Sequence, residues 1–112
     1  MQKHERLEQD VKRALTSIIA EELKNPDVTG IISVTSVRVT PDQKYAKIFV
    51  SIFNVKDKEK VLEGLKRSTK FIRGSLGRSV KMRNVPELTF VLDDSIEYGA
   101  YMNEVFKNLN DK

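Results

Sequence analysis

The strongest constraint on the fold is the run KYAKIFVSIF at residues 44–53, in which aliphatic side chains recur at every second position. Successive side chains of a β-strand point to opposite faces, so one face of this run is aliphatic and the other is mixed. The aliphatic face consists of Ala46, Ile48, Val50 and Ile52. A strand of this kind belongs to a sheet with one buried face, and we expect helices to cover that face.

The preceding run, ISVTSVRVT at residues 32–40, is also rich in β-branched residues and predicts a second strand. The two runs are separated by Thr40-Pro41-Asp42-Gln43, which has the proline and the aspartate of a turn. We therefore predict a hairpin. The apolar phase slips between Val34 and Val37, which indicates a β-bulge at Thr35-Ser36.

Two other segments space their apolar residues three or four positions apart, as helices with one buried side do. The first lies near residues 4–24 and should end at Asn25-Pro26-Asp27, because the residue before a proline is disfavoured in a helix. The second covers residues 57–80, and its apolar stripe is interrupted at Ser68-Thr69. A kink at this interruption would divide the segment into two helices.

A third strand is predicted at ELTFVLDD, residues 87–94, where Leu88, Phe90 and Leu92 alternate with other residues. The remaining segment, 95–112, forms a tail in which we expect a short helix. The element order is therefore α-β-β-α-α-β. We expect a single α+β domain over residues 1–112, with a core at about 4–94 and a three-stranded antiparallel sheet that has helices on one face.

Composition excludes several classes of protein. Cysteine is absent and histidine occurs once, which excludes a disulfide scaffold, a thiol nucleophile and a zinc site built on cysteine or on several histidines. No apolar run approaches the length of a membrane span, and the first twenty residues lack the apolar core of a signal peptide. We expect a cytoplasmic monomer without a cofactor, a metal ion or a membrane partner.

Positive charge is concentrated in residues 64–86, which contain seven cations and no acid, whereas the rest of the chain holds 13 cations against 16 acids. A solvated helix face without a partner would ordinarily mix both signs of charge. Clustered cations favour a polyanion, because phosphate binding releases condensed counterions. We predict a nucleic-acid-binding surface formed by Lys66, Arg67, Lys70, Arg73, Arg78, Lys81 and Arg83.

Three stretches carry a family resemblance: FIRGSLGRSVKMRNVPELTF at 71–90, VTSVRVTPDQKYAKIFVSI at 34–52 and IIAEELKNPDVTG at 18–30. They are similar to the signature, the hairpin and the first helix end of the ribosome-binding factor A family. The resemblance implies a type II KH-like fold and a non-catalytic factor that binds the immature small (30S) ribosomal subunit and its 16S rRNA. It further implies late subunit maturation, rRNA processing and cold adaptation as the biological role.

The tetrapeptide GSLG at residues 74–77 matches the GxxG loop with which KH domains hold a nucleic-acid backbone. We place it inside the third helix instead, because the apolar stripe continues past it. Glycines there would permit close packing or the close approach of a backbone or phosphate. In the family that the sequence resembles, an Ala-x-Gly kink replaces the KH loop. Ser68, Thr69 and Lys70 hold the matching positions, and the two hydroxyls can turn the chain by bonding to nearby backbone.

The aromatic residues Tyr45, Phe49 and Phe53 lie on the mixed face of their strand. Such residues could stack nucleobases, as in a generic KH-like or related single-stranded nucleic-acid-binding module. Their four-residue spacing favours the alternative that they cover the edges of the core or lie beneath the tail.

An enzyme would need a different set of residues. Asp93, Asp94 and Glu97 could hold Mg²⁺ for phosphodiester chemistry. A strand end followed by a helix cap uses the same residue types, and no general base, nucleophile or phosphate loop accompanies these acids. We therefore predict no catalysis. A protein-interaction adaptor that uses the tail is the other alternative.

Overall fold

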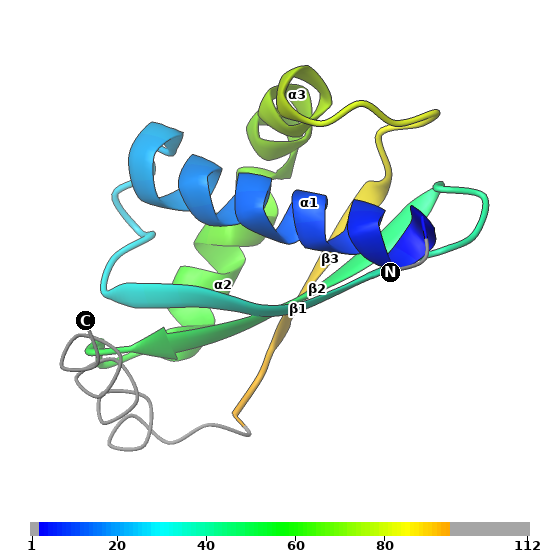
Figure 1. Cartoon of the computed structure of the whole chain (residues 1–112). Coiled ribbons are helices and arrows are strands. Elements are labelled where there is room, and N and C mark those ends of the chain that lie inside the picture. Colours follow the sequence, from blue (N-terminus) through cyan, green and yellow to red (C-terminus); the bar gives the residue numbers. More distant parts are fainter. Residues whose placement is uncertain (1–2, 95–112) are drawn as a thin grey trace, which may run out of the picture.

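The computed structural model describes residues 3–94, and the tail with its predicted helix lies outside them. Figure 1 shows the elements in the order α-β-β-α-α-β that the sequence predicts. They are α1 (Lys3–Ser17), the π-helical turn η1 (Ile18–Glu22), β1 (Ile31–Val39), β2 (Tyr45–Phe53), α2 (Lys58–Arg67), α3 (Thr69–Ser79) and β3 (Glu87–Leu92). None of the helices within residues 3–94 is both long and apolar enough to cross a membrane.

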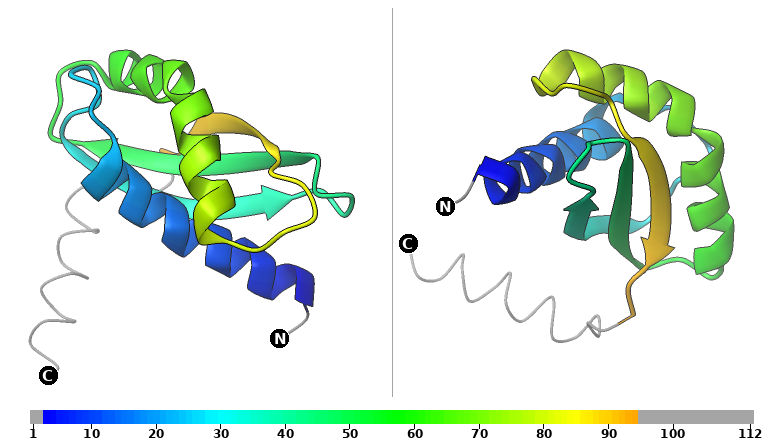
Figure 2. Two further views of the ribbon diagram at one scale, coloured as in Figure 1. Left: turned by 90° about the horizontal axis from the view of Figure 1, so that it is seen from above. Right: turned by 90° about the vertical axis from the view of Figure 1, so that its right-hand side faces the viewer.

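The three strands form one mixed sheet in the order β1-β2-β3. Strand β1 is antiparallel to β2, and β3 is parallel to β2, so the prediction of an entirely antiparallel sheet is wrong. The physical reason is the crossover through α2 and α3, which brings the chain back to the end of the sheet where β2 begins (Figure 2). The predicted bulge is confirmed, since the β1–β2 register shifts between Val34 and Ser36.

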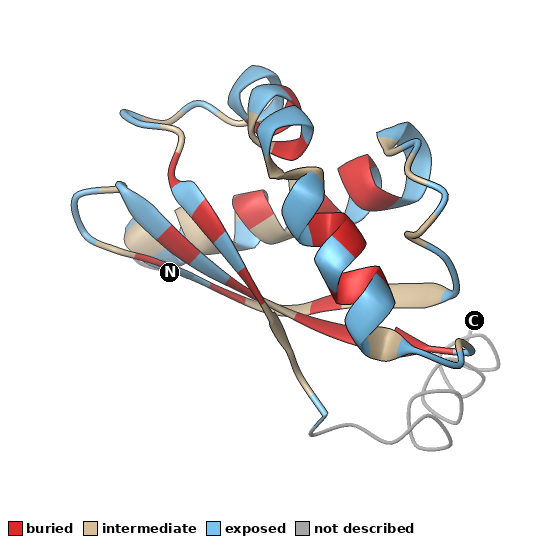
Figure 3. Ribbon diagram, turned by 180° about the vertical axis from the view of Figure 1, so that it is seen from behind, coloured by how far each residue is buried: buried red, intermediate tan, exposed pale blue. Residues whose placement is uncertain are grey.

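The buried face of the sheet carries the aliphatic residues that the alternating pattern predicts. Ala46, Ile48, Val50 and Ile52 are at most 3% exposed. Figure 3 shows buried and exposed residues alternating along parts of the strands, as at the beginnings of β2 and β3, whereas residues 50–53 of β2 are all buried. The buried face forms one apolar cluster with the helices, so the helices cover this face, and each buried aliphatic side chain stabilises the fold by about 1.5–3 kcal/mol. The helical members of the cluster are Val11, Leu15, Ile18, Ile19, Val61, Leu62, Leu65, Ile72 and Leu76.

The π-helical turn η1 changes the side-chain phase at the end of the first helix. The N–H of Leu23 donates to the carbonyl of Ile18, five residues back, at 3.0 Å. Consecutive side chains lie closer together in angle on such a turn, because it holds more residues than an α-helical one. Ile18 and Ile19 are both buried in this turn, three and four residues after the buried Leu15. The chain leaves the helix before Asn25, as the Asn-Pro-Asp sequence predicts.

Candidate nucleic-acid interface

The kink between α2 and α3 falls at Ser68, where the chain departs from helical geometry with φ −91° and ψ 4°. The Ser68 N–H donates to the carbonyls of Gly64 and Leu65, both at 3.1 Å, and its hydroxyl donates to the Gly64 carbonyl at 2.9 Å. The Thr69 hydroxyl donates to the Lys66 carbonyl at 2.6 Å. The Thr69 hydroxyl thus gives the Lys66 carbonyl a partner at the end of α2, and the Ser68 hydroxyl adds a second bond to the Gly64 carbonyl.

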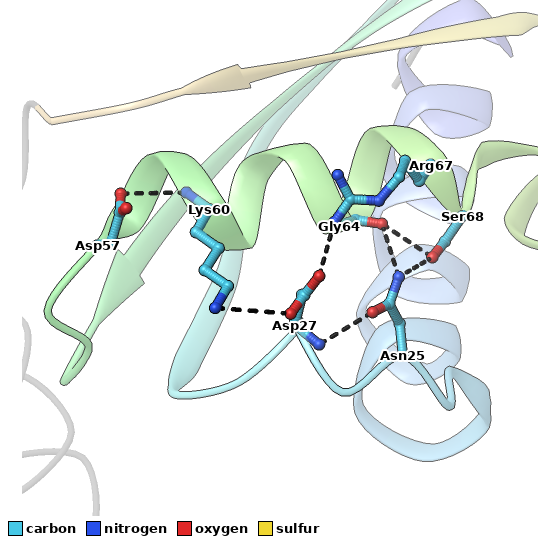
Figure 4. Close-up of polar contacts among 7 residues, drawn as sticks. All are labelled: Asn25, Asp27, Asp57, Lys60, Gly64, Arg67 and Ser68. Atoms are coloured by element: carbon cyan, nitrogen blue, oxygen red, sulfur yellow. Dashed lines mark hydrogen bonds and ion pairs between the residues drawn. The ribbon is translucent and has the colours of Figure 1, made fainter.

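The loop that follows η1 braces this kink (Figure 4). The side-chain amide of Asn25 donates to the Ser68 hydroxyl at 3.0 Å and to the Gly64 carbonyl at 3.2 Å. The absence of a side chain at Gly64 lets this loop lie against α2, because a Cβ there would lie 3.0 Å from Val28 Cγ2 and 3.2 Å from Asp27 Cβ. Sequence reasoning assigned Asn25 and Asp27 only to the end of the first helix and gave them no part in the kink, since their partners there lie about forty residues away in the sequence.

Two of the predicted cations are paired with acids. Arg67 Nη2 lies 2.7 Å from Asp27 Oδ2, as Figure 4 shows, and Lys66 Nζ lies 3.4 Å from Glu63 Oε1. Both acids come from outside the acid-free segment 64–86. Because all four side chains are substantially exposed to solvent, each pair contributes at most about 1 kcal/mol. Exchange of either carboxylate for a phosphate therefore has a small energetic cost.

Arg73 and Arg83 are bound to backbone carbonyls. Arg73 is half-buried, and its Nε and Nη2 donate to the carbonyls of Pro86 and Val85, both at 2.9 Å. It ties α3 to the segment that leads into β3. Arg83 is exposed, and its Nη2 donates to the Pro41 carbonyl in the hairpin turn at 3.3 Å. The donors of Arg73 are thus directed into the fold, although sequence reasoning placed this residue among the ligand-binding cations.

The side chains of Lys70, Arg78 and Lys81 are exposed and form no hydrogen bond or ion pair with any residue between positions 3 and 94. The buried residues of α3, including Ile72 and Leu76, face the core and leave the flanking positions to solvent. Lys70 stands in the first turn of α3, which contains no acid. The positive end of the helix dipole disfavours a cation there, so the stability of the helix does not account for this lysine.

The GSLG tetrapeptide lies within α3, so the alternative of a KH loop is wrong. Its two glycines differ in their surroundings. A Cβ at Gly77 would lie 2.9 Å from Val85 Cγ2, so the missing side chain permits close packing. A Cβ at Gly74 would meet only Arg78 Nη1, at 3.6 Å, which is an ordinary contact. Close packing therefore explains Gly77 and does not explain Gly74.

The aromatic residues Tyr45, Phe49 and Phe53 do not form one exposed row. Tyr45 is 57% exposed, Phe49 is half-buried and Phe53 is only 5% exposed. Within residues 3–94, the other large hydrophobic residue with high exposure is Phe71 on α3, at 47%. Sequence reasoning assigned no role to Phe71. Its position one residue before the buried stripe, between Lys70 and Ile72, is the signal that could have identified it.

The acids after β3 have partners within the fold. The carboxylate of Asp93 accepts a hydrogen bond from the Thr35 hydroxyl at 2.7 Å, and the carboxylate of Asp94 lies 3.6 Å from Lys58 Nζ. Glu97 lies outside the described residues. Between residues 3 and 94, no three His, Cys, Asp or Glu side chains are grouped so that they could hold a metal ion.

The chain is similar to known proteins over most of its length. A family model described as ribosome-binding factor A matches residues 3–106. Ribosome-binding factor A of Caldanaerobacter subterraneus subsp. tengcongensis is 43% identical over 106 residues, which are 94% of this chain and 87% of that protein. Ribosome-binding factor A of Clostridium botulinum strain Hall is 45% identical over 107 residues, which are 95% and 89% of the two chains.

Solved structures agree with this similarity. The crystal structure of ribosome-binding factor A from Thermus thermophilus has a TM-score of 0.73 and 29% identity, and the match covers 84% of this chain and 99% of that one. A homology model of the Thermus factor, fitted into a cryo-EM map of a 30S complex with it, has a TM-score of 0.64 and 31% identity over 77% and 90% of the two chains. The chain therefore belongs to the ribosome-binding factor A family.

Proposed function

We propose that this protein binds the immature small ribosomal subunit through 16S rRNA and assists its late maturation and rRNA processing. The proposal rests on one observation: a homology model of the Thermus factor, 31% identical to this chain, was fitted into the cryo-EM map of a 30S complex with that factor. The charge distribution supports the same partner. Phosphate contacts contribute a large share of the affinity of nucleic-acid-binding proteins, and the acid-free segment supplies exposed cations for them.

The proposed contact surface is centred on Lys70, Arg78 and Lys81. Their side chains are exposed and form no hydrogen bond or ion pair with a residue between 3 and 94. Lys66, Arg67 and Arg83 extend this surface, because their present bonds are exposed and weak. Arg73 contributes its charge and holds α3 in place. This division predicts that cations of the same segment contribute unequally to binding.

The physical mechanism is stabilisation of one rRNA conformation. A protein that binds one conformation more tightly than another shifts the population by its differential affinity, and each tenfold difference in affinity corresponds to about 1.4 kcal/mol. No catalytic group and no cofactor is needed for such a shift. We accordingly propose a non-catalytic cytoplasmic monomer, and the cold adaptation implied by the family resemblance belongs to the same proposal.

The test compares two triple charge reversals. The first replaces Lys70, Arg78 and Lys81 by glutamate. The matched control makes the same change of net charge at the exposed residues Lys3, Arg6 and Lys56. Binding to purified immature and mature small subunits is measured by co-sedimentation across a salt series.

We expect the first variant to bind well over tenfold more weakly than the control. The slope of log affinity against log salt should fall by about one for each phosphate contact that is lost. Equal binding by the two variants would overturn the proposed surface. Binding by the unaltered protein that does not respond to salt would instead favour a protein-interaction adaptor.

A further inference from the structure

We propose that α3 carries a site for one unstacked nucleobase of single-stranded RNA, formed by Phe71, the bare backbone at Gly74 and the guanidinium of Arg78. The proposal rests on the proposed function, because it specifies which feature of the RNA the cationic surface contacts. The three residues are spaced at i, i+3 and i+7, so they follow one another along a single side of the helix.

Phe71 provides an aromatic surface beside an open hollow. The hollow has a volume of about 430 Å³, within the range of small-ligand sites. Leu23 and Pro26 give it apolar walls, and Lys24 adds a cation. The remaining lining residues are Glu22, Asn25, Ser68 and Phe71 itself. A planar, apolar ligand with a negatively charged attachment fits these walls, and a nucleotide is such a ligand.

Gly74 supplies an independent observation. A single exposed phenylalanine needs no explanation, because soluble proteins commonly expose isolated apolar side chains. An exposed glycine in the middle of a helix does need one, since alanine would stabilise the helix there. Nothing between residues 3 and 94 requires Gly74, because a Cβ would make only an ordinary contact with Arg78. Glycine is the residue that lets a ligand approach the backbone closely.

The surrounding charges orient the ligand. Arg78 reaches back along α3, with its Nη1 3.6 Å from the place where a Cβ of Gly74 would stand. Lys70 adjoins Phe71 and is also exposed. The phosphates therefore belong beside Lys70 and Arg78. Glu22 also lines the hollow, where its carboxylate accepts a hydrogen bond from the Ser75 hydroxyl, so the uncharged base rather than a phosphate belongs beside it.

The ligand must be single-stranded. The bases of a duplex are stacked on one another and cannot lie flat on an aromatic side chain, whereas bases in loops and ends can. The site is continuous with the proposed phosphate-binding surface, because Arg78 belongs to both and Lys70 is adjacent to Phe71 in the sequence. An unpaired rRNA nucleotide is thus the occupant that the charges and the aromatic residue favour.

The experiment measures fluorescence anisotropy of a labelled oligoadenylate of about ten nucleotides, a length within the usual size of single-strand sites. The same strand in a duplex serves as the comparison. We expect the protein to prefer the single strand. Phe71→Leu keeps an apolar side chain of similar size and should weaken single-strand binding at least about fivefold, while Phe71→Trp should retain it.

Salt dependence separates stacking from charge. Phe71→Leu should lower the affinity by the same factor at every salt concentration, because it removes no phosphate contact. Arg78→Gln should reduce the log–log salt slope by about one. Gly74→Ala should raise the thermal midpoint of unfolding and yet weaken binding, a combination that a purely structural role cannot produce.

The outcomes separate this inference from the proposed function. Suppose that the triple reversal at Lys70, Arg78 and Lys81 abolishes binding to RNA and subunits, while Phe71→Leu and Gly74→Ala bind as the unaltered protein does. The base site would then be overturned and the proposed function would stand. Failure of the unaltered protein to bind either RNA or small subunits would overturn both.

Discussion

Alanine substitutions at the two glycines of α3 are expected to change the free energy of unfolding differently, although the same atoms are added to the same helix. Replacing a helical glycine by alanine stabilises a helix by about 1 kcal/mol. At Gly74 this gain should be kept, because the new Cβ would meet only the tip of the long Arg78 side chain, at 3.6 Å. We expect Gly74→Ala to stabilise the protein by about 1 kcal/mol.

Gly77→Ala should lose that gain. The new Cβ would lie 2.9 Å from Val85 Cγ2, closer than van der Waals contact allows. Valine is stiff at χ1, and Arg73 holds the Val85 carbonyl at 2.9 Å, so neither the side chain nor the backbone of Val85 is free to move away. Overpacking of this kind costs about 1–3 kcal/mol, which leaves Gly77→Ala between neutral and about 2 kcal/mol destabilising.

Urea unfolding followed by circular dichroism measures both variants under identical conditions. The intrinsic helix preference largely cancels between them, so their difference should be the overpacking cost alone, about 1–3 kcal/mol at an unchanged denaturant slope. Adding Val85→Ala to Gly77→Ala should relieve the crowding and serves as the control. If Gly77→Ala proves as stable as Gly74→Ala, the packing explanation of Gly77 is refuted.

Two further predictions concern residues with structural partners. Arg73→Met should destabilise the protein by about 2–3 kcal/mol in the same urea assay, because it removes two hydrogen bonds from a charged group to backbone carbonyls, while Arg73→Lys should be less damaging. The Thr40 hydroxyl, followed by the Lys44 amide, lowers the pKa of Asp42 below its ordinary value. The stabilisation linked to this carboxylate is therefore complete above the pKa of the unfolded chain and is lost as the pH falls through the lowered folded pKa. Thr40→Val should raise the Asp42 pKa in an NMR titration of the carboxyl group.

Much of the fold could be predicted because its determinants are local. Alternation of side chains on β2 and the three- and four-residue spacing in the helices depend only on near neighbours in the sequence. The kink at Ser68 is local as well, since its bonds run to carbonyls one turn earlier. The direction of β3 could also have been inferred, because a strand reached through a helical crossover on one face of a sheet is normally parallel to its predecessor.

The candidate site could be predicted only in part, because the role of each cation depends on partners that are distant in sequence. Arg67 and Asp27 are forty residues apart, and no local pattern connects them. Arg73 stands in the same acid-free segment as the exposed cations, yet its side chain donates to carbonyls of the segment before β3. Charge density therefore predicts a segment, but it could not separate the arginine that holds the fold from the cations that remain exposed.

The composition of α3 is itself an argument for a ligand. Its first turn has a lysine and no acid, the N-cap residue Ser68 makes no side-chain capping hydrogen bond, and Gly74 interrupts its exposed side. Each feature weakens an isolated helix. The helix is instead held by burial of Ile72 and Leu76 and by the bonds of Arg73. Because tertiary contacts on the buried side hold the helix, its exposed side does not need residues that stabilise a helix. The acid-free surface that we propose for a polyanion requires this.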